Sequence, residues 1–426
     1  MHLITRKTCR VCRSDALTPV IDLGPQHLQG SFVKEGKEDP PMRLIPCQLV
    51  RCDPTKDEKA CGLLQMRHTV PPPILYSAYW YRSGTNNTMR NHLKGLADAS
   101  VELLSKPGAV ALDIGCNDGT LLKALPADFV RYGVDPSDVA QEVNDDKISV
   151  VQDIFPSPQL ANLLDGRKLD LITSIAMFYD LEDPVAFCRN IRDALANDGL
   201  WIFEMSYMPT MLARNMYDTI CHEHLEYYSF AVIEKILARA DLHVFRVEFN
   251  DINGGSIRCF ATHRGNTKYI TAEDQQFISK VRQSEFDLAL DTDAPYREFQ
   301  SRIEKETEAL RSLLTDLKRD GKTIHIYGAS TKGNTILQFC GIGNDIIDCA
   351  AERNPDKYGA RTLGTNIPIV SEADSRAMKP DYYLVLPWHF KAEFIEREKA
   401  MLDAGVGLIF PLPTIETLKR ERTEAA

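Results

Sequence analysis

A regular alternation of apolar and helical segments between residues 109 and about 205 constrains the fold of this chain more than any other feature. Its apolar runs are short and rich in valine, isoleucine and leucine, and each has the length of a buried parallel strand. They read AVALDIG, FVRYGVDP, KISVVQD, LDLITSIAMF and GLWIFEMS. Helical stretches and turn residues separate them, which is typical of a doubly wound sheet in an α/β protein.

A glycine-containing loop follows the first of these strands and opens a helix. Asp113, Gly115, Asn117 and Gly119 give it the pattern D-x-G-x-N-x-G. Glycines let the backbone approach a ligand closely, and the helix N-terminus offers free N–H groups. Asn117 stands where the dinucleotide fingerprint G-x-G-x-x-G needs its second glycine, so the loop argues against NAD.

Two acidic residues end the next two strands. Asp135, about twenty residues past the loop, can accept hydrogen bonds from both ribose hydroxyls of a nucleotide. Asp153 ends the third strand, where it can accept from an adenine amino group. In this order the features resemble the S-adenosylmethionine site of class I methyltransferases. The resemblance predicts cofactor contacts from eight residues, namely Asp113, Gly115, Asn117, Asp118, Gly119, Asp135, Asp153 and Ile154.

Five of the eleven cysteines fall before residue 62, which indicates metal binding. Cys9-x-x-Cys12 has the spacing of a zinc knuckle, and Cys47, Cys52 and Cys61 are the candidates for the remaining ligands. We predict that Cys47 and Cys61 complete the site, with Cys52 in place of Cys47 as the alternative. Four thiolates leave no open position, so the zinc is expected to be structural. Free thiols in a reducing compartment are the competing interpretation.

The densest group of proton-transfer side chains is Cys221-His222-Glu223-His224. It lacks the H-E-x-x-H spacing of zinc peptidases, so a general acid–base role suits it better than metal binding. Histidine titrates near neutrality, and an adjacent carboxylate can orient the ring. A packed His–Glu pair with only structural hydrogen bonds is the alternative. The tyrosines of YSAYWYRSG, including Tyr79 and Tyr81, are expected either to close over the active site or to form an aromatic domain interface.

A second α/β unit is expected near the C-terminus. The segment KTIHIYGASTKGNTILQFC reads as strand, loop and helix, and further short apolar runs follow it. Lys332 and backbone amides at a helix N-terminus suit a phosphate or pyrophosphate, and a purely structural loop is an equal alternative. Before this unit, HVFRVEFNDINGGSIRCFATHR indicates two antiparallel strands around a turn. Residues 272–318 are polar and helical in pattern.

Charge and hydropathy exclude several classes of protein. The formal net charge of −10 argues against a nucleic-acid binder, which needs a basic surface. No run of 18 apolar residues exists, so no membrane-spanning helix is expected. The N-terminus lacks the apolar core of a signal peptide, and we expect a cytoplasmic location. A monomer or small homo-oligomer is expected.

Read together, the segments resemble the sugar C-methyltransferases of deoxysugar biosynthesis, including the enzyme that methylates carbon 3 of a nucleotide-linked 4-keto aminosugar on the way to tetronitrose. The resemblance covers nearly the whole chain, and it is carried by Cys9-x-x-Cys12, CGLLQ, YWYRSG, DIGCNDGTLL, HEHLEYYS, NGGSIR and YGASTKGNT. It implies a zinc-binding domain (1–72), a methyltransferase domain with a catalytic insert (73–268), a helical linker (269–320) and a Rossmann-like domain that holds the sugar nucleotide (321–426).

The resemblance also implies site residues. His224 is the implied base, with Glu223 and His222 in support and a tyrosine of the Tyr79/Tyr81 pair in the substrate pocket. Three positions depart from the family: Asp180 and Asn253 stand where a histidine is frequent, and Cys221 stands where a tyrosine is frequent. The predicted substrate contacts are Asp180, Cys221, Asn253, Gly254, Lys332 and Asn334.

The implied reaction begins with removal by His224 of the proton beside a 4-keto group. Tyr79, Tyr81 or His222 would stabilise the resulting enolate, and its carbon would accept the methyl group of S-adenosylmethionine. Two alternatives remain at this point. One is an O- or N-methyltransferase acting on a sugar or related metabolite, and the other is a non-enzymatic zinc-containing scaffold.

Overall fold

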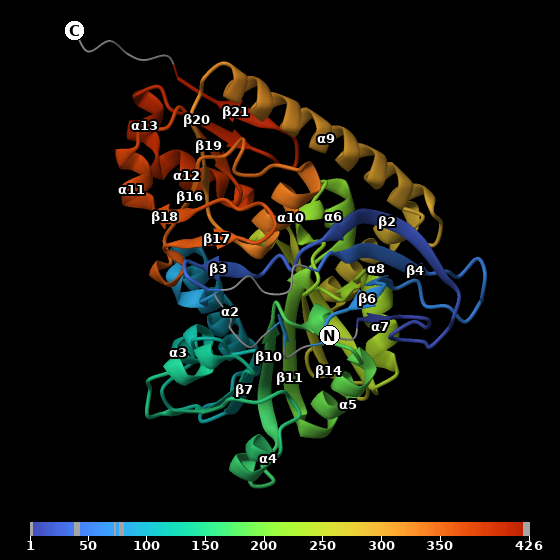
Figure 1. Cartoon of the computed structure of the whole chain (residues 1–426). Coiled ribbons are helices and arrows are strands. Elements are labelled where there is room, and N and C mark those ends of the chain that lie inside the picture. Colours follow the sequence, from blue (N-terminus) through green and yellow to red (C-terminus); the bar gives the residue numbers. More distant parts are fainter. Residues whose placement is uncertain (1–2, 38–42, 72–73, 76–80, 421–426) are drawn as a thin grey trace.

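A computed structural model of the chain describes residues 3–37, 43–71, 74–75 and 81–420 (Figure 1). Its largest sheet has seven strands in the order β13-β14-β11-β10-β7-β8-β9. The five strands predicted between residues 109 and 205 run parallel, and β14 and β13 extend the edge in antiparallel fashion. The strands are β7 (Val110–Ile114), β8 (Val130–Val134), β9 (Ile148–Val151), β10 (Leu169–Ile175), β11 (Leu195–Ser206), β13 (Leu242–Asn250) and β14 (Ser256–His263).

Alternate residues of the central strands are buried in two different layers. Leu112, Ile172 and Trp201 belong to the core on one face of the sheet, and their neighbours Ala111, Leu171 and Ile202 belong to the core on the other. Burial on both faces explains the continuous apolar runs in the sequence. The helices that accompany this sheet are α2 (Asn87–Leu104), α3 (Thr120–Ala124), α4 (Pro158–Leu164), α5 (Pro184–Ala194), α7 (Phe230–Ala238) and α8 (Ala272–Asp287).

The N-terminal region forms a small antiparallel sheet in the order β12-β5-β4-β2. Three of its strands come from the first 70 residues, but β12 (Glu226–Tyr227) comes from the segment directly after the His-Glu-His cluster. The others are β2 (Leu17–Gln26), β4 (Ile45–Cys52) and β5 (Leu64–Met66), with a separate ribbon of β1 (Ile4–Thr5) and β6 (His68–Thr69). The candidate catalytic segment is therefore part of the N-terminal sheet.

The C-terminal unit is a second doubly wound sheet in the order β18-β16-β15-β19-β20-β21. Only β21 is antiparallel to its neighbour. Its strands are β15 (Ile324–Tyr327), β16 (Cys349–Glu352), β18 (Ile369–Ser371), β19 (Tyr382–Val385), β20 (Gly407–Phe410) and β21 (Glu416–Leu418). Its helices are α10 (Thr331–Cys340), α11 (Glu372–Ala377), α12 (Lys391–Arg397) and α13 (Lys399–Asp403). The predicted α/β class with two such sheets is confirmed.

Contacts between distant parts of the sequence join these units. The long helix α9 (Ala294–Arg319) packs on β2 and on α6 (Met208–Ala213) (Figure 1). Strand β17 (Ala360–Thr362) pairs with β3 (Phe32–Lys34) from the other end of the chain. The packing of α9 on β2 and the pairing of β17 with β3 each join segments from different predicted domains, as does the pairing of β12 with β5. In the described ranges, no helix is both long and apolar enough to cross a membrane.

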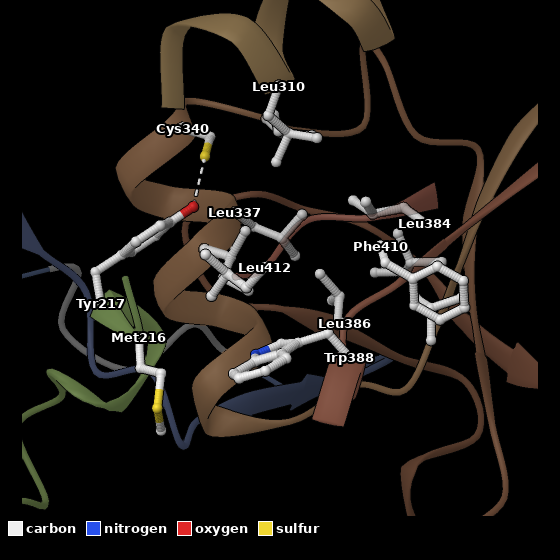
Figure 2. Close-up of a cluster of buried hydrophobic side chains, with 14 of the residues drawn as sticks. Met216, Tyr217, Leu310, Leu337, Cys340, Leu384, Leu386, Trp388, Phe410 and Leu412 are labelled. Carbon is white, nitrogen blue, oxygen red and sulfur yellow. Dashed lines mark hydrogen bonds between the residues drawn. The ribbon is translucent and has the colours of Figure 1, made fainter. Parts of the chain in front are cut away.

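The segment leading into the His-Glu-His cluster is anchored in the C-terminal core. Met216 and Tyr217 lie against α10, and the Tyr217 hydroxyl is 3.4 Å from the Cys340 sulfur (Figure 2). Trp388, at the end of β19, lies in the same cluster. Both aromatic side chains are buried, so the start of the candidate catalytic segment is fixed by apolar packing.

Candidate active site and metal centre

Four cysteine sulfurs meet in the N-terminal region. The Sγ atoms of Cys9, Cys12, Cys52 and Cys61 all lie within 4.8 Å of one another. Cys9 is 3.5 Å from Cys61, and Cys12 is 3.4 Å from Cys52. A tetrahedral zinc with Zn–S bonds of about 2.3 Å requires sulfur separations of about 3.8 Å, so the group fits zinc with small adjustments. All four positions are taken by thiolates, which matches a structural rather than a catalytic metal.

The prediction of Cys47 as a zinc ligand is wrong, and Cys52 takes its place. Both residues lie in β4, five positions apart, and side chains on a strand alternate between its faces. Cys47 therefore points away from the cluster, where its thiol donates to the Ile220 carbonyl at 3.4 Å. Burial raises the pKa of Cys47 to about 12, so it stays a neutral thiol.

The glycine loop between β7 and α3 has the backbone that its sequence indicates. Gly115, Asn117 and Gly119 adopt φ values of +76°, +50° and +72°. A Cβ atom on Gly115 would lie 3.2 Å from Met177 Cγ, so a larger residue would crowd the loop. These conformations leave the backbone open to a ligand, which fits the predicted cofactor role.

Asp135 supports the same loop from the next strand. One of its carboxylate oxygens accepts from Asn117 N at 2.9 Å, and the other accepts from the Ser137 amide and hydroxyl. A carboxylate offers about four acceptor sites, so Asp135 retains capacity for a ligand hydroxyl. The residue is buried at the end of β8.

The side chains of Asn117 and Asp118 hold the segment Tyr81–Gly84 against the loop. Asn117 donates to the Tyr81 carbonyl at 3.0 Å and accepts from Ser83 N at 2.9 Å. Asp118 accepts from Gly84 N at 2.7 Å. Both side chains therefore support the Tyr81–Gly84 segment, and their direct contact with a cofactor stays a prediction. The Tyr81 side chain is exposed, and Tyr79 lies outside the described residues.

Two further acids stand at the ends of their strands in very different surroundings. Asp113 is buried and accepts from the Thr173 hydroxyl at 2.6 Å, and burial raises its pKa to about 7. Asp153 accepts from Ser157 Oγ and from Ile154 N, and these hydrogen bonds lower its pKa. The Ile154 side chain is exposed beside it.

His224 has the tautomer of a general base. Its Nδ1–H donates to the Thr219 carbonyl at 2.7 Å, which leaves the lone pair on Nε2. Desolvation, together with the nearby Lys332 ammonium, lowers the pKa of His224 to about 3. The imidazole is therefore neutral at physiological pH and able to accept a proton.

A short element connects His224 with the glycine loop. The ring of Tyr179 packs on the His224 ring at 4.3 Å between centroids. Tyr179 lies in the turn η3 (Phe178–Asp180), which follows Met177, the residue whose side chain a Cβ atom on Gly115 would meet. Next to these rings is a cavity of about 10 Å³, room for roughly one water molecule. It is lined by Tyr179, Ser206, Tyr207, Met208, Met211, Thr219, His224, Glu226 and Tyr227.

The other two members of the cluster contact neighbouring units. His222 is fully buried, with Nδ1 2.7 Å from Gln29 Oε1 and Nε2 3.2 Å from the Ile45 carbonyl. Both ring nitrogens face oxygen atoms of the N-terminal region, so His222 contacts that region, and its support of catalysis stays a prediction. Burial raises the pKa of Glu223 to about 7, although a hydrogen bond with Thr331 opposes this shift.

The C-terminal unit and the glycine turn contribute the remaining predicted residues. Lys332 donates to the Asn253 carbonyl at 2.9 Å, and Asn334 donates to the Gln29 carbonyl at 2.6 Å. Gly254, at φ +94°, lies so close to Met216 and Trp388 that a Cβ would approach them within 3.0 Å. Cys221 is fully buried, which raises the pKa of its thiol.

Several buried polar atoms near the cluster lack a hydrogen-bond partner among the residues that the structure describes. They include Asp180 Oδ1, Asp218 Oδ1, Asn334 Oδ1 and His389 Nδ1. Burial and the charge of Glu223 raise the pKa of Asp180, and burial raises that of Asp218 while Lys332 opposes the shift. Buried polar atoms are normally paired, so water or a polar ligand is the expected partner here.

Sequence reasoning missed Asp218, Glu226 and His389. Asp218 is fully buried and accepts from the Trp388 indole N–H at 2.9 Å. Burial and Lys332 lower the pKa of His389 to about 3. Their positions in the sequence could have indicated these residues. Asp218 and Glu226 flank the His-Glu-His cluster, and His389 follows a buried strand of the C-terminal unit.

Comparisons with known proteins agree with this arrangement. Three family models match successive parts of the chain: a zinc binding domain (residues 9–76), a methyltransferase domain (89–247) and a C-methyltransferase C-terminal domain (251–413). The C-methyltransferase NovU of Streptomyces niveus is 29% identical, over 97% of each chain.

Solved methyltransferase structures match a smaller part of the chain. The magnesium protoporphyrin IX methyltransferase of Synechocystis PCC 6803, with bound SAH, is 18% identical, over 42% of this chain and 88% of its own, with a TM-score of 0.33. The N-methyltransferase NodS of Bradyrhizobium japonicum WM9 is 16% identical, over 42% of this chain and 89% of its own, also with a TM-score of 0.33.

Proposed function

We propose that the chain is an S-adenosylmethionine-dependent C-methyltransferase with a zinc-binding N-terminal domain, and that it methylates carbon 3 of a nucleotide-linked 4-keto-deoxysugar through an enolate. The observation that carries this proposal is the state of His224. A neutral imidazole with a free Nε2 lies beside a lysine and one short turn away from the cofactor loop. Methylation of carbon requires such a base, because the C–H proton must leave before the new bond forms.

The surroundings of His224 set its tautomer and its protonation state. A ketone acidifies the adjacent C–H bond, and Nε2 of His224 accepts the proton while the Thr219 carbonyl fixes the tautomer. The low pKa keeps His224 unprotonated but makes it a weak base, so the enolate itself needs stabilisation. Bound S-adenosylmethionine supplies the methyl group. Gly115, Gly119 and Asp135 are the residues that we expect to hold it.

Lys332 is our candidate for stabilising the enolate oxygen. Its ammonium lies near His224, Asp218 and His389, as its effects on their pKa values indicate. A cation in a buried site interacts strongly with a developing negative charge. This role replaces that of His222, whose ring nitrogens are both engaged elsewhere. The sequence predicted that Lys332 binds a phosphate. In that role Lys332 would contact the nucleotide part of the substrate instead of the enolate oxygen.

Changing Lys332 to methionine should separate these two roles. A role in enolate stabilisation predicts a kcat about ten- to a hundredfold lower with a nearly unchanged KM, from the roughly 1.5–3 kcal/mol that a hydrogen bond to a charged group contributes. A phosphate contact predicts a higher KM with a nearly unchanged kcat. Steady-state kinetics with the sugar nucleotide as the varied substrate distinguish the two results. Arginine at this position keeps the positive charge and should recover part of the lost kcat or KM effect.

The pH dependence of cofactor binding should report on Asp113. Its carboxyl has a pKa of about 7 in the free protein, and the positively charged sulfonium of S-adenosylmethionine favours the ionised form. Binding therefore releases a proton, so affinity should rise with pH up to about 7 and then level off. The total rise should be about tenfold for each unit by which binding lowers the pKa.

Calorimetry from about pH 6 to about pH 8 measures this effect. S-adenosylhomocysteine, which has no sulfonium charge, should show a smaller dependence, and Asp113→Asn should show none. A flat profile for the unaltered protein would refute the assignment.

The proposed reaction is tested by incubating the protein with S-adenosylmethionine and a panel of 4-keto sugar nucleotides. The expected product is heavier by one methylene, with its new methyl located on carbon 3 by NMR. In deuterated buffer, a carbon-methylating enzyme should also exchange the proton beside the ketone, whereas an O- or N-methyltransferase should not. A methyl group on oxygen or nitrogen, without exchange, would replace our proposal with that alternative.

A further inference from the structure

The segment that carries the base is completed by the N-terminal sheet. Strand β12 begins two residues after His224, and its residues pair with β5, Glu226 opposite Gln65 and Tyr227 opposite Leu64. Between them, Leu225 donates its N–H to the Tyr179 carbonyl and accepts from Met66 N, both at 2.8 Å. The backbone just after His224 is thus hydrogen-bonded to η3 on one side and to the zinc-binding region on the other.

Arg10 connects the cysteine knuckle with this strand. It lies between Cys9 and Cys12 and is fully buried. Its guanidinium donates to the Met66 carbonyl at 2.7 Å, to Thr69 Oγ1 at 2.7 Å and to Gln65 Oε1 at 3.2 Å. Four of its contacts, counting its backbone N–H to Gln65, are therefore made with the strands that follow Cys61.

The guanidinium also faces a buried carboxylate on β12. Arg10 Nε lies 3.8 Å from Glu226 Oε1, and both side chains are buried from solvent. Burial raises the pKa of Glu226, and the Arg10 guanidinium and the Leu181 backbone N–H oppose this shift. Arg6 also acts on Glu226 electrostatically, and Glu182 lies 3.5 Å from Arg10, so the pair sits in a small charged network. Removing one partner of such a pair leaves an uncompensated buried charge.

We propose that Arg10 is a positioning residue for the base. By pairing with Glu226, it keeps β12 on the N-terminal sheet and thereby holds His224 against Tyr179 with its Nδ1–H on the Thr219 carbonyl. The segment Cys9–Cys12 and the segment that carries His224 are then held in a fixed relative position. Glu226 and His224 line the same small cavity, so a shift of β12 displaces the imidazole directly. The inference rests on the proposed role of His224.

The test is a double-mutant cycle on the full-length, zinc-loaded protein. Arg10→Met should lower kcat by up to about a hundredfold, the effect that a misplacement of about 1 Å can have on catalysis, with little change in KM or in affinity for S-adenosylmethionine. Arg10→Met/Glu226→Leu, with Glu226→Leu alone completing the cycle, removes the unpaired Glu226 charge and should recover the part of kcat lost through that charge. The hydrogen bonds of Arg10 to Gln65, Met66 and Thr69 are absent from both Arg10 variants. Arg13→Met is the matched control, because Arg13 lies in the same region but pairs with Asp183 at the surface, and it should behave as the unaltered protein.

A second measurement needs no substrate. NMR with isotope-labelled histidine should show His224 as the Nδ1–H tautomer in the unaltered protein and a changed ring signal in Arg10→Met, with recovery in the double variant. This readout keeps its meaning even if no 4-keto sugar nucleotide is methylated. The proposal is overturned if Arg10→Met retains its kcat and ring signal, or if the double variant, folded and with its zinc, is as impaired as the single one.

Discussion

Replacement of His224 by glutamine is expected to lower the rate of methyl transfer by about 10²–10⁴-fold, the usual contribution of a general base. The glutamine amide can still donate to the Thr219 carbonyl, so the segment should keep its conformation. What it lacks is a basic nitrogen in place of Nε2. Exchange of the substrate proton with deuterated solvent should be lost together with methyl transfer.

Cofactor binding separates this effect from a general loss of structure. The affinity for S-adenosylmethionine should be unchanged, because the glycine loop and Asp135 form the expected cofactor site and are not altered. His263→Gln serves as a control. His263 is the last residue of β14, and the glycine turn lies at the other end of this strand. The two ends are about 23 Å apart at about 3.3 Å per residue. A His224→Gln protein with nearly full activity would exclude His224 as the base.

Replacement of Cys52 by serine is expected to abolish stable zinc binding, whereas Cys47→Ser should retain it. Cys52 is one of the four clustered thiolates, and Cys47 is not. Structural zinc contributes about 10–16 kcal/mol of binding energy in zinc-finger peptides, and that energy is coupled to folding. Cys52→Ser should therefore lower the melting temperature strongly and, because β12 belongs to the same sheet, reduce methyl transfer as well.

Metal analysis by mass spectrometry and thermal unfolding with and without a chelator measure this difference. The unaltered protein and Cys47→Ser should lose stability when the metal is removed. Cys52→Ser should already be in the destabilised state and respond little. The opposite pattern, with zinc retained in Cys52→Ser and lost in Cys47→Ser, would return the fourth ligand position to Cys47.

Much of the site follows from local sequence. The glycine loop and the acids at the ends of β8 and β9 were predicted from residue type and position relative to a predicted strand, and His224 from the density of proton-transfer groups around it and the family resemblance. Asp118 and Asn117 were assigned to the cofactor by the same reasoning, and the structure adds that their side chains hold Tyr81–Gly84. Position next to a loop does not say which way a side chain points, because that depends on the segment packed above it.

The family resemblance assigned different roles to the members of the His-Glu-His cluster, and the structure adds the different surroundings of the two histidines. His222 and His224 have the same chemistry and lie two residues apart, yet one is enclosed by Gln29 and Ile45 and the other has a free Nε2. The contacts that distinguish them come from residues almost two hundred positions earlier for His222, and from Thr219 and Lys332 for His224. Glu226 and His389 were missed for the same reason.

The sequence alone determined the α/β class, the positions of the five parallel strands along the central region and the residue types available for catalysis, because hydrophobic periodicity and turn residues act over a few neighbouring positions. Only the tertiary structure decided which cysteine joins the zinc group, which tautomer His224 adopts, and that β12 joins the segment after His224 to the N-terminal sheet. Each of these depends on pairing, tautomer or burial set by chain segments far apart in sequence, and desolvation and hydrogen bonding act only once those segments are packed together.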